Sequence, residues 1–171
     1  MTNRTQQNGF SLIEVCVALV VGSVLLAMAL PAMEQLKQRQ RLQALAQTMA
    51  ADLQFARSTA VTNGYSVQFR FTAVAGGSCY LIYTGGTAAC RCEDGGKAVC
   101  TPAGQVLKRG WVPSSEKMAV TANVPLMHFQ ARQGAVTSTG SVDISADSGQ
   151  AIRHRVSITG RVRTCSPSGS L

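Results

Sequence analysis

Aromatic residues and charges are both scarce in this chain of 171 residues. Aromatic residues make up 5% of the sequence, and Asp, Glu, Lys and Arg together make up 14%. So few aromatics disfavour a platform on which the bases of single-stranded nucleic acid stack, and so few charges disfavour a coiled coil. The hydrophobic content of 46% excludes an intrinsically disordered chain. The length corresponds to about one domain with its own core.

Signatures of catalysis are also missing. The only histidines, His128 and His154, stand outside any triad or metal-binding motif. The sequence has no G-x-S-x-G nucleophile elbow and no G-x-x-x-x-G-K phosphate-binding loop. We therefore expect no catalytic residue, no cofactor and no metal, and a protein that is not an enzyme.

What the chain does have is one long apolar run, residues 10–33, behind the polar residues 1–9. Its 24 residues are more than the roughly 20 that a helix needs to span a bilayer. The run is also longer than the apolar region of a secretory signal peptide, so a membrane span is predicted. Its one charged residue, Glu14, would cost about 2.5–3.5 kcal/mol inside a membrane. Cleavage after Gly9 would free the α-amino group of Phe10, one helical turn away, to pair with Glu14 in the same or a neighbouring subunit.

The segment GFSLIEV, residues 9–15, resembles the class III signal of type IV pilins and type II secretion pseudopilins. The resemblance implies that a prepilin peptidase cuts between Gly9 and Phe10 and methylates the new amine. It also implies that the apolar helix anchors the subunit in the bacterial inner membrane and later packs in the fibre core, where Glu14 assists docking with other pilin subunits.

Residues 34–63 continue with an amphipathic helical pattern, free of Pro and Gly. Their apolar stripe advances 18 residues in five steps, which is the helical period of 3.6, and Gly64 supplies a stop. We expect one helix from about Phe10 to Asn63. The stripe consists of Leu42, Leu45, Met49, Leu53, Ala56 and Ala60.

Residues 64–171 have the alternation and the Gly-rich turns of a β domain. The sequence therefore predicts an α+β fold in which the long helix packs on an antiparallel sheet. The resemblance to pilins implies that this is a type IV pilin-like fold and that the β domain lies in the periplasm. The expected strands are 65–71, 79–83, 124–130, 135–139 and 141–145.

Five cysteines follow the apolar run. In the periplasm they would form disulfides, and the spacing C-x10-C-x-C-x7-C lacks the C-x2-C pairs usual in zinc sites. Two bridges within residues 76–102 would leave one cysteine over, and the sequence leaves the connectivity open. The disulfide candidates are Cys79, Cys90, Cys92, Cys100 and Cys165.

The C-terminal tail concentrates positive charge in a chain whose net charge is +8. Residues 148–171 contain four arginines and no acid. The alternation over 151–159 predicts a strand with Ile152, Val156 and Ile158 on its inner face and with Arg153 and Arg155 on its outer face. Arg161 and Arg163 would again share one side, where arginine forks can bind phosphate. A merely solvated basic face is the alternative.

The chain as a whole resembles the GspH/FimT group of minor pilins, which has an A-R-S segment like residues 56–58. Residues 160–163, GRVR, resemble the G-R-x-R motif with which FimT proteins of this group bind DNA in natural transformation. The resemblance implies that Gly160, Arg161 and Arg163 bind double-stranded DNA in a pilus at the cell surface. Arg153 and Arg155 join this candidate site only through their shared parity on the predicted strand.

Two other functions fit the same N-terminal half. The protein would then be a structural minor pilin, or a GspH-like pseudopilin of type II secretion, that primes fibre assembly without binding DNA. A third hypothesis, an adhesin, has only the unusual composition of the cysteine-rich loop behind it. The tail distinguishes the DNA-binding function from the structural ones.

Overall fold

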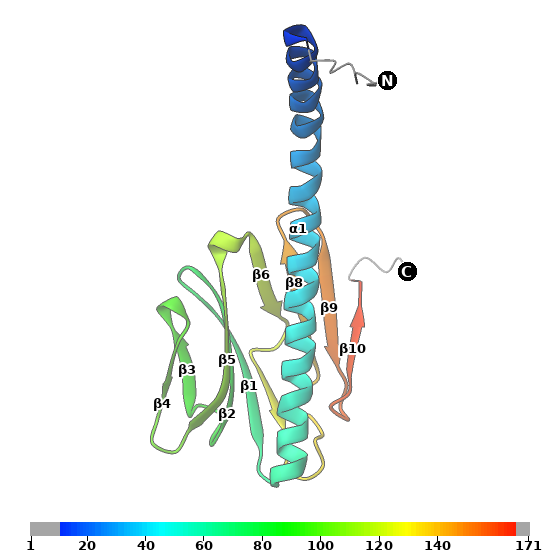
Figure 1. The fold of residues 1–171 in the computed structure, drawn as a ribbon. Coiled ribbons are helices and arrows are strands. Elements are labelled where there is room, and N and C mark those ends of the chain that lie inside the picture. The colour runs from blue at the N-terminus through cyan, green and yellow to red at the C-terminus, as the bar shows by residue number, and fades with distance from the viewer. Residues whose placement is uncertain (1–10, 167–171) are drawn as a thin grey trace, which may run out of the picture. The chain divides into compact units, whose positions relative to one another are not determined.

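The computed structural model describes residues 11–166, and side chains at 28–32 are left aside. The chain divides into two compact units, Met1–Gln38 and Arg39–Leu171. Figure 1 shows the elements of the second unit, a helix and three antiparallel sheets.

One helix, α1, covers Leu12–Asn63, close to the predicted limits. The carbonyl of Ser11 accepts the first backbone hydrogen bonds, from the N–H groups of Glu14 and Val15 at 3.0 and 3.2 Å. Serine is a favoured residue at this capping position. Gly64 ends the helix with a φ of +70°, a left-handed conformation that glycine adopts without steric cost.

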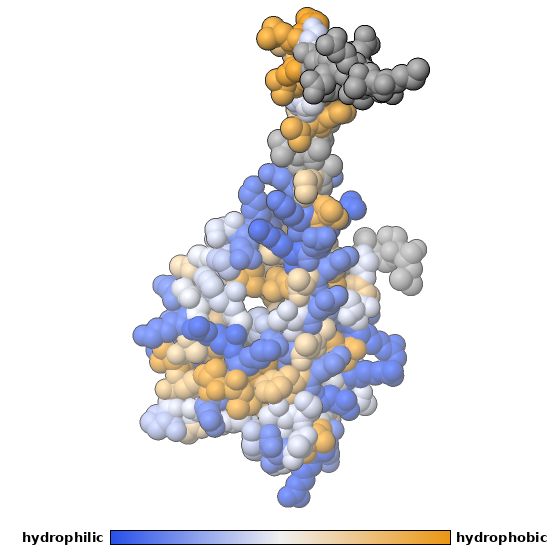
Figure 2. Space-filling model, viewed as in Figure 1, coloured by the Kyte–Doolittle hydropathy of each residue, from blue (hydrophilic) through white to orange (hydrophobic). Residues whose placement is uncertain are grey.

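The first turns of α1, residues 12–27, expose many apolar side chains. Leu12 is 84% exposed and Leu19 is 68% exposed, and hydrophobic side chains stand open on these first turns (Figure 2). Among the residues that the structure describes, none of the helical segments is both long and apolar enough to cross a membrane.

The second unit holds three antiparallel sheets. The first has the order β5-β2-β1-β7 and the second β10-β9-β8-β6, while β3 and β4 form a separate hairpin. The strands are β1 (Val67–Val74), β2 (Gly77–Thr84), β3 (Cys90–Glu93), β4 (Lys97–Cys100), β5 (Gln105–Pro113), β6 (Met118–Ala122), β7 (Leu126–Phe129), β8 (Gly140–Ala146), β9 (Ala151–Val156) and β10 (Val162–Cys165).

The helical stripe forms the centre of the core, as its period predicts. Met49 and Leu53 are fully buried and share one cluster with Phe69 of the first sheet and Ile144 of the second. Burying a side chain of this size contributes about 1.5–3 kcal/mol, so α1 holds the two large sheets together. Leu45, at the edge of the stripe, is only partly buried.

The same helical face carries a carboxylate that the apolar stripe does not predict. Asp52 is 1% exposed. It accepts a hydrogen bond of 2.6 Å from the Tyr80 hydroxyl and forms an ion pair with Lys108. Burial raises the pKa of the Tyr80 phenol, and the bond to Asp52 raises it further. The pair satisfies a charge that would otherwise be costly to bury.

The β domain exists as predicted, but its strand list needs correction. The expected strands near 65–71, 79–83, 124–130 and 141–145 correspond to β1, β2, β7 and β8, whereas 135–139 contributes only an isolated bridge at Val136. Four strands, β3 to β6, were not predicted.

Two disulfides, Cys79–Cys92 and Cys90–Cys100, lie within the predicted segment, residues 76–102.

Candidate nucleic-acid interface

The basic tail folds back on itself as a hairpin. Strand β9 ends at Val156, and β10 returns antiparallel beside it, with Arg163 opposite Arg155. The predicted strand over 151–159 is therefore wrong beyond Val156. Ile158, expected on the inner face, lies at the turn and is 67% exposed.

Gly160 produces this reversal. Its φ of +70° completes a short turn, in which its N–H donates to the Ser157 carbonyl at 2.8 Å. A left-handed residue after a tight turn is typical of three-residue hairpin loops. The turn also presses on its neighbours, because a Cβ at Gly160 would collide with the carbonyl oxygen of Gly134. The motif glycine thus has a structural role, which is to aim the arginines that flank it.

Three arginines of the hairpin gather at one groove of about 560 Å³. Arg155 comes from β9, Arg163 from β10, and Arg161 from the turn between them, and all three are exposed. Within residues 11–166 their guanidinium groups have no ion-pair or hydrogen-bond partner, and no described acid or aromatic lines the groove. Thr139, Ser157 and Thr159 add hydroxyls to its rim. The arrangement suits a polyanion that is held by its phosphates.

Arg153 differs from the other three arginines. Its Nε and Nη2 donate two hydrogen bonds of 2.6 Å to the carboxylate of Asp143 on β8. The hydrogen bonds and the charge of Asp143 raise the pKa of Arg153. Strand parity put Arg153 and Arg155 on the same face, but the cross-strand acid neutralises Arg153. This pairing has no signal in the sequence, because Asp143 lies ten residues earlier on another strand.

The inner face of the hairpin carries His154, which is 1% exposed. Its Nδ1 lies 2.9 Å from the Thr164 hydroxyl, so the side chains of β9 and β10 are linked beneath the arginines. Burial lowers the pKa of His154, and the backbone of Ala46 on α1 offsets part of this effect. Since neutral imidazole is the form suited to this position, the structure explains His154 as a core residue.

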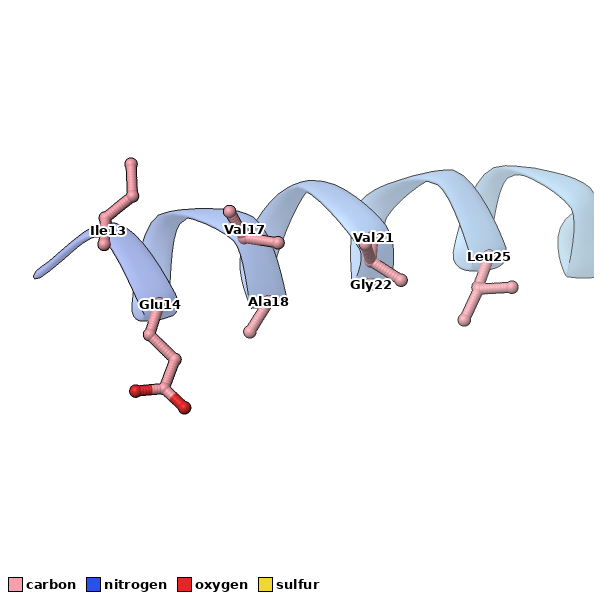
Figure 3. Close-up of a pocket in the computed structure, with 7 residues that line it drawn as sticks. All are labelled: Ile13, Glu14, Val17, Ala18, Val21, Gly22 and Leu25. Atoms are coloured by element: carbon pink, nitrogen blue, oxygen red, sulfur yellow. The ribbon is translucent and has the colours of Figure 1, made fainter. Parts of the chain in front are cut away.

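The N-terminal candidates lie in the first unit. Gly9 and Phe10, the predicted processing site, lie outside the described residues. Glu14 is exposed and lies at one end of a shallow, otherwise apolar groove along α1 (Figure 3). Glu14, Ala18 and Leu25 point to the same side of the helix, as residues spaced by about whole turns do. Glu14 has no ion-pair partner within residues 11–166.

Two cysteines, Cys16 and Cys165, lie outside the two disulfides. Cys165 is exposed at the end of β10, and neither it nor Cys16 forms a disulfide in the described part of the chain. In the same part, no group of three or more His, Cys, Asp or Glu could hold a metal ion.

Comparison with family models gives two matches. A family described as "Type II transport protein GspH" matches residues 45–160. The "Prokaryotic N-terminal methylation motif" matches residues 4–30. The first match covers α1 from Leu45 onward, all strands through β9, and Gly160, but it ends just before Arg161. No curated protein matches the chain.

Solved structures resemble the chain in fold. The type IV minor pilin FimU of Pseudomonas aeruginosa, in space group P21, has a TM-score of 0.55 at 18% identity, covering 77% of this chain and 92% of FimU. Its P65 crystal form gives 0.52 at 19% identity, with 74% and 94% covered. The minor pseudopilin EpsH of the Vibrio cholerae type 2 secretion system gives 0.49 at 13% identity, with 75% and 98% covered. The FimU structures show that the chain has a type IV pilin-like fold.

Proposed function

The chain belongs to the GspH family of type II transport proteins, and from this premise we propose that it is a minor pilin that binds double-stranded DNA during uptake for natural transformation. Family and methylation motif together make it a minor pilin or pseudopilin of the GspH type. DNA binding is the finer proposal, and the hairpin β9–β10 carries it.

The N-terminal part of the proposal concerns processing and anchoring. The methylation motif supports cleavage after Gly9 by a prepilin peptidase and methylation of the new amine of Phe10. The exposed apolar side chains at 12–27 support anchoring in the inner membrane and later burial against other pilin subunits. In that setting Glu14 would pair with the amine of Phe10 in its own or a neighbouring subunit, because a carboxylate among apolar residues needs a cationic partner.

One observation carries the DNA-binding proposal: Arg155, Arg161 and Arg163 line a single groove and are free of internal partners within the described residues. Arg153 on the same hairpin is, by contrast, paired with Asp143. Three adjacent unpaired guanidiniums repel one another, and a polyanion relieves this repulsion. The net charge of +8 adds a long-range attraction for DNA.

The chemistry of the groove favours duplex DNA without sequence preference. Phosphate contacts position a protein on DNA but carry no direct sequence information. Proteins that prefer single strands stack bases on aromatic rings, and no described residue lining this groove is aromatic. The expected affinity of one subunit is that of non-specific binding, with a Kd of about 10⁻⁴–10⁻⁶ M. Several copies in one fibre would hold DNA more firmly.

The alternative function is structural. A minor pilin or type II secretion pseudopilin would prime fibre assembly and leave DNA unbound. The description of the matching family as a type II transport protein favours this alternative, as does the end of that match just before Arg161.

The test is equilibrium binding of the full chain in neutral detergent micelles to a 30-base-pair duplex of arbitrary sequence. Three phosphate contacts predict that log K falls with log salt at a slope of about −2.7. Arg161→Gln and Arg163→Gln should each weaken binding about five- to tenfold at 0.1 M salt, because each variant loses one phosphate contact and the salt slope becomes shallower by about 0.9.

A single strand of the same sequence is the matched competitor. The proposal expects the duplex to compete at least as well as the single strand, and a second duplex sequence to compete equally. Absence of duplex binding at 50 mM salt would support the structural alternative instead. Binding that both arginine variants retain in full would move any DNA site away from the hairpin.

A further inference from the structure

We infer that Arg57 of α1 forms a second wall of the phosphate-binding site, facing the hairpin across a groove of its own. This inference rests on the proposed function and extends it from the tail to the helix. It predicts a DNA-binding surface built from two elements that lie about a hundred residues apart in the sequence.

The groove between helix and hairpin supplies the geometry. Its lining includes Gln54, Arg57 and Ser58 from α1, and Gly160 and Arg161 from the hairpin. Arg161 also lines the groove that holds Arg155 and Arg163. The two grooves therefore share Arg161 in their lining, and we call the two together the track. No described acid lines either groove.

The stem of Arg57 is held in place by two glycines. A Cβ added at Gly160 would stand 2.9 Å from Arg57 Cδ and 3.0 Å from Nε. A Cβ at Gly134 would stand 3.0 Å from Arg57 Cγ. The side chain therefore lies across both glycines, where any larger residue would displace it. A side chain positioned in advance loses less conformational entropy on binding than a free one.

The guanidinium of Arg57 remains available despite this packing. The residue is exposed, and within residues 11–166 it has no ion-pair or hydrogen-bond partner. A purely structural arginine would bond a carbonyl or a carboxylate here, as Arg70 bonds the Thr87 carbonyl. Arg57 instead presents an unpaired charge beside Arg161, which is the condition that defines the hairpin site.

The track thus contains four unpaired arginines, and this number is measurable. Three phosphate contacts predict a salt slope of about −2.7, and a fourth shifts the slope to about −3.6. The slope counts neutralised phosphates, so it separates a binding arginine from one that only supports the turn.

The experiment compares Arg57→Gln with Arg57→Lys and Arg41→Gln, in the full chain in neutral detergent micelles. The probe is a fluorescent 30-base-pair duplex, titrated between 50 and 200 mM salt. Glutamine keeps part of the aliphatic stem of Arg57 and removes the positive charge, whereas lysine keeps the stem and the charge. Arg41, exposed on the same helix, lines neither groove and is the matched control. Thermal unfolding of each variant reports whether the hairpin stays folded.

The inference expects Arg57→Gln to weaken binding about five- to tenfold at 0.1 M salt and to reduce the slope by about 0.9. Arg57→Lys should keep the slope, and Arg41→Gln should bind as the parent protein does. An Arg57→Gln slope equal to that of the parent overturns the inference, while loss of binding in Arg163→Gln still upholds the proposed function. A parent protein that binds no duplex overturns both.

Discussion

Two hairpins at opposite ends of the second unit use different means to hold their shape (Figure 1). The hairpin β3–β4 is joined internally by Cys90–Cys100 and tied to β2 by Cys79–Cys92. The hairpin β9–β10 has no disulfide among its described residues, and depends on the turn at Gly160, on His154 against α1, and on pairing with β8.

The two hairpins also treat charge differently. On β3, Arg91 donates to Glu93 at 3.0 Å, so that positive charge is neutralised locally. On β9–β10 only Arg153 is paired, and the arginines around the groove are left open. Disulfides therefore stabilise one hairpin, where an exposed ion pair neutralises Arg91, while in the other a non-covalent scaffold presents unpaired arginines.

Removal of the Cys90–Cys100 disulfide should have the largest effect on stability and none on DNA binding. Cys90→Ser together with Cys100→Ser should lower the free energy of unfolding by about 2–4 kcal/mol, because the bridge constrains the unfolded chain. Urea unfolding measures this loss. The duplex affinity of the folded variant should equal that of the parent, and a weaker affinity would show that the two hairpins are not independent.

Gly160→Ala should have the next largest effect. The left-handed φ alone costs a residue with a side chain about 1–2 kcal/mol, and the collision with the Gly134 carbonyl adds to it. Gly149→Ala is the control, since Gly149 has a φ of +81° and nothing within 4 Å of an added Cβ. Gly160→Ala should therefore unfold at lower urea than Gly149→Ala and bind duplex less tightly. Equal stabilities would contradict the close approach at the turn.

His154 should make stability depend on pH. Burial lowers its pKa in the folded protein, so the unfolded chain binds more protons in mildly acidic solution. The stabilising contribution is present above the unfolded pKa of about 6.5 and is lost as the pH falls below it. Urea midpoints at pH 7.5 and pH 5 measure this loss. His154→Gln should flatten the difference between the two midpoints; an undiminished difference in this variant would refute the assignment to His154.

Arg153→Gln should have the smallest effect on DNA binding. Because Asp143 already neutralises Arg153, the salt slope should stay at the parent value. Arg155→Gln, two residues further along the same strand, should reduce the slope by about 0.9. A reduced slope in Arg153→Gln would mean that DNA displaces Asp143, and the distinction between paired and unpaired arginines would fail.

Much of the fold follows from sequence periodicity. The stripe from Leu42 to Ala60 predicts α1 and its buried face, and alternation predicts β1 and β2. The sequence does not predict the four strands β3 to β6, because these strands are stabilised by tertiary contacts and have little local alternation. Strand β3 shows this, since its cysteines are paired with β2 and β4 and its short sequence has little apolar alternation.

The sequence predicts which arginines form the candidate site, but it does not predict how these arginines are paired or placed. The sequence identifies Arg161 and Arg163 through a motif and Arg155 through parity, and the structure brings these three to one groove. The ion pair of Arg153 and the approach of Arg57 to Gly160 depend on tertiary neighbours. The turn itself had a local signal, a glycine between two short basic segments, which indicates a hairpin as readily as a bulge.

The most direct test of the central claim compares two variants of equal charge. The first variant replaces the three groove arginines, Arg155, Arg161 and Arg163, by Gln. The second replaces Lys37, Arg41 and Lys97 by Gln, and these three residues are exposed and line neither groove. Duplex binding is measured for both in the full chain at 0.1 M salt. The account predicts that the first variant loses at least about a hundredfold in affinity, while the second stays within a few-fold of the parent. Equal losses in both would show that net charge, and not the hairpin, attracts DNA.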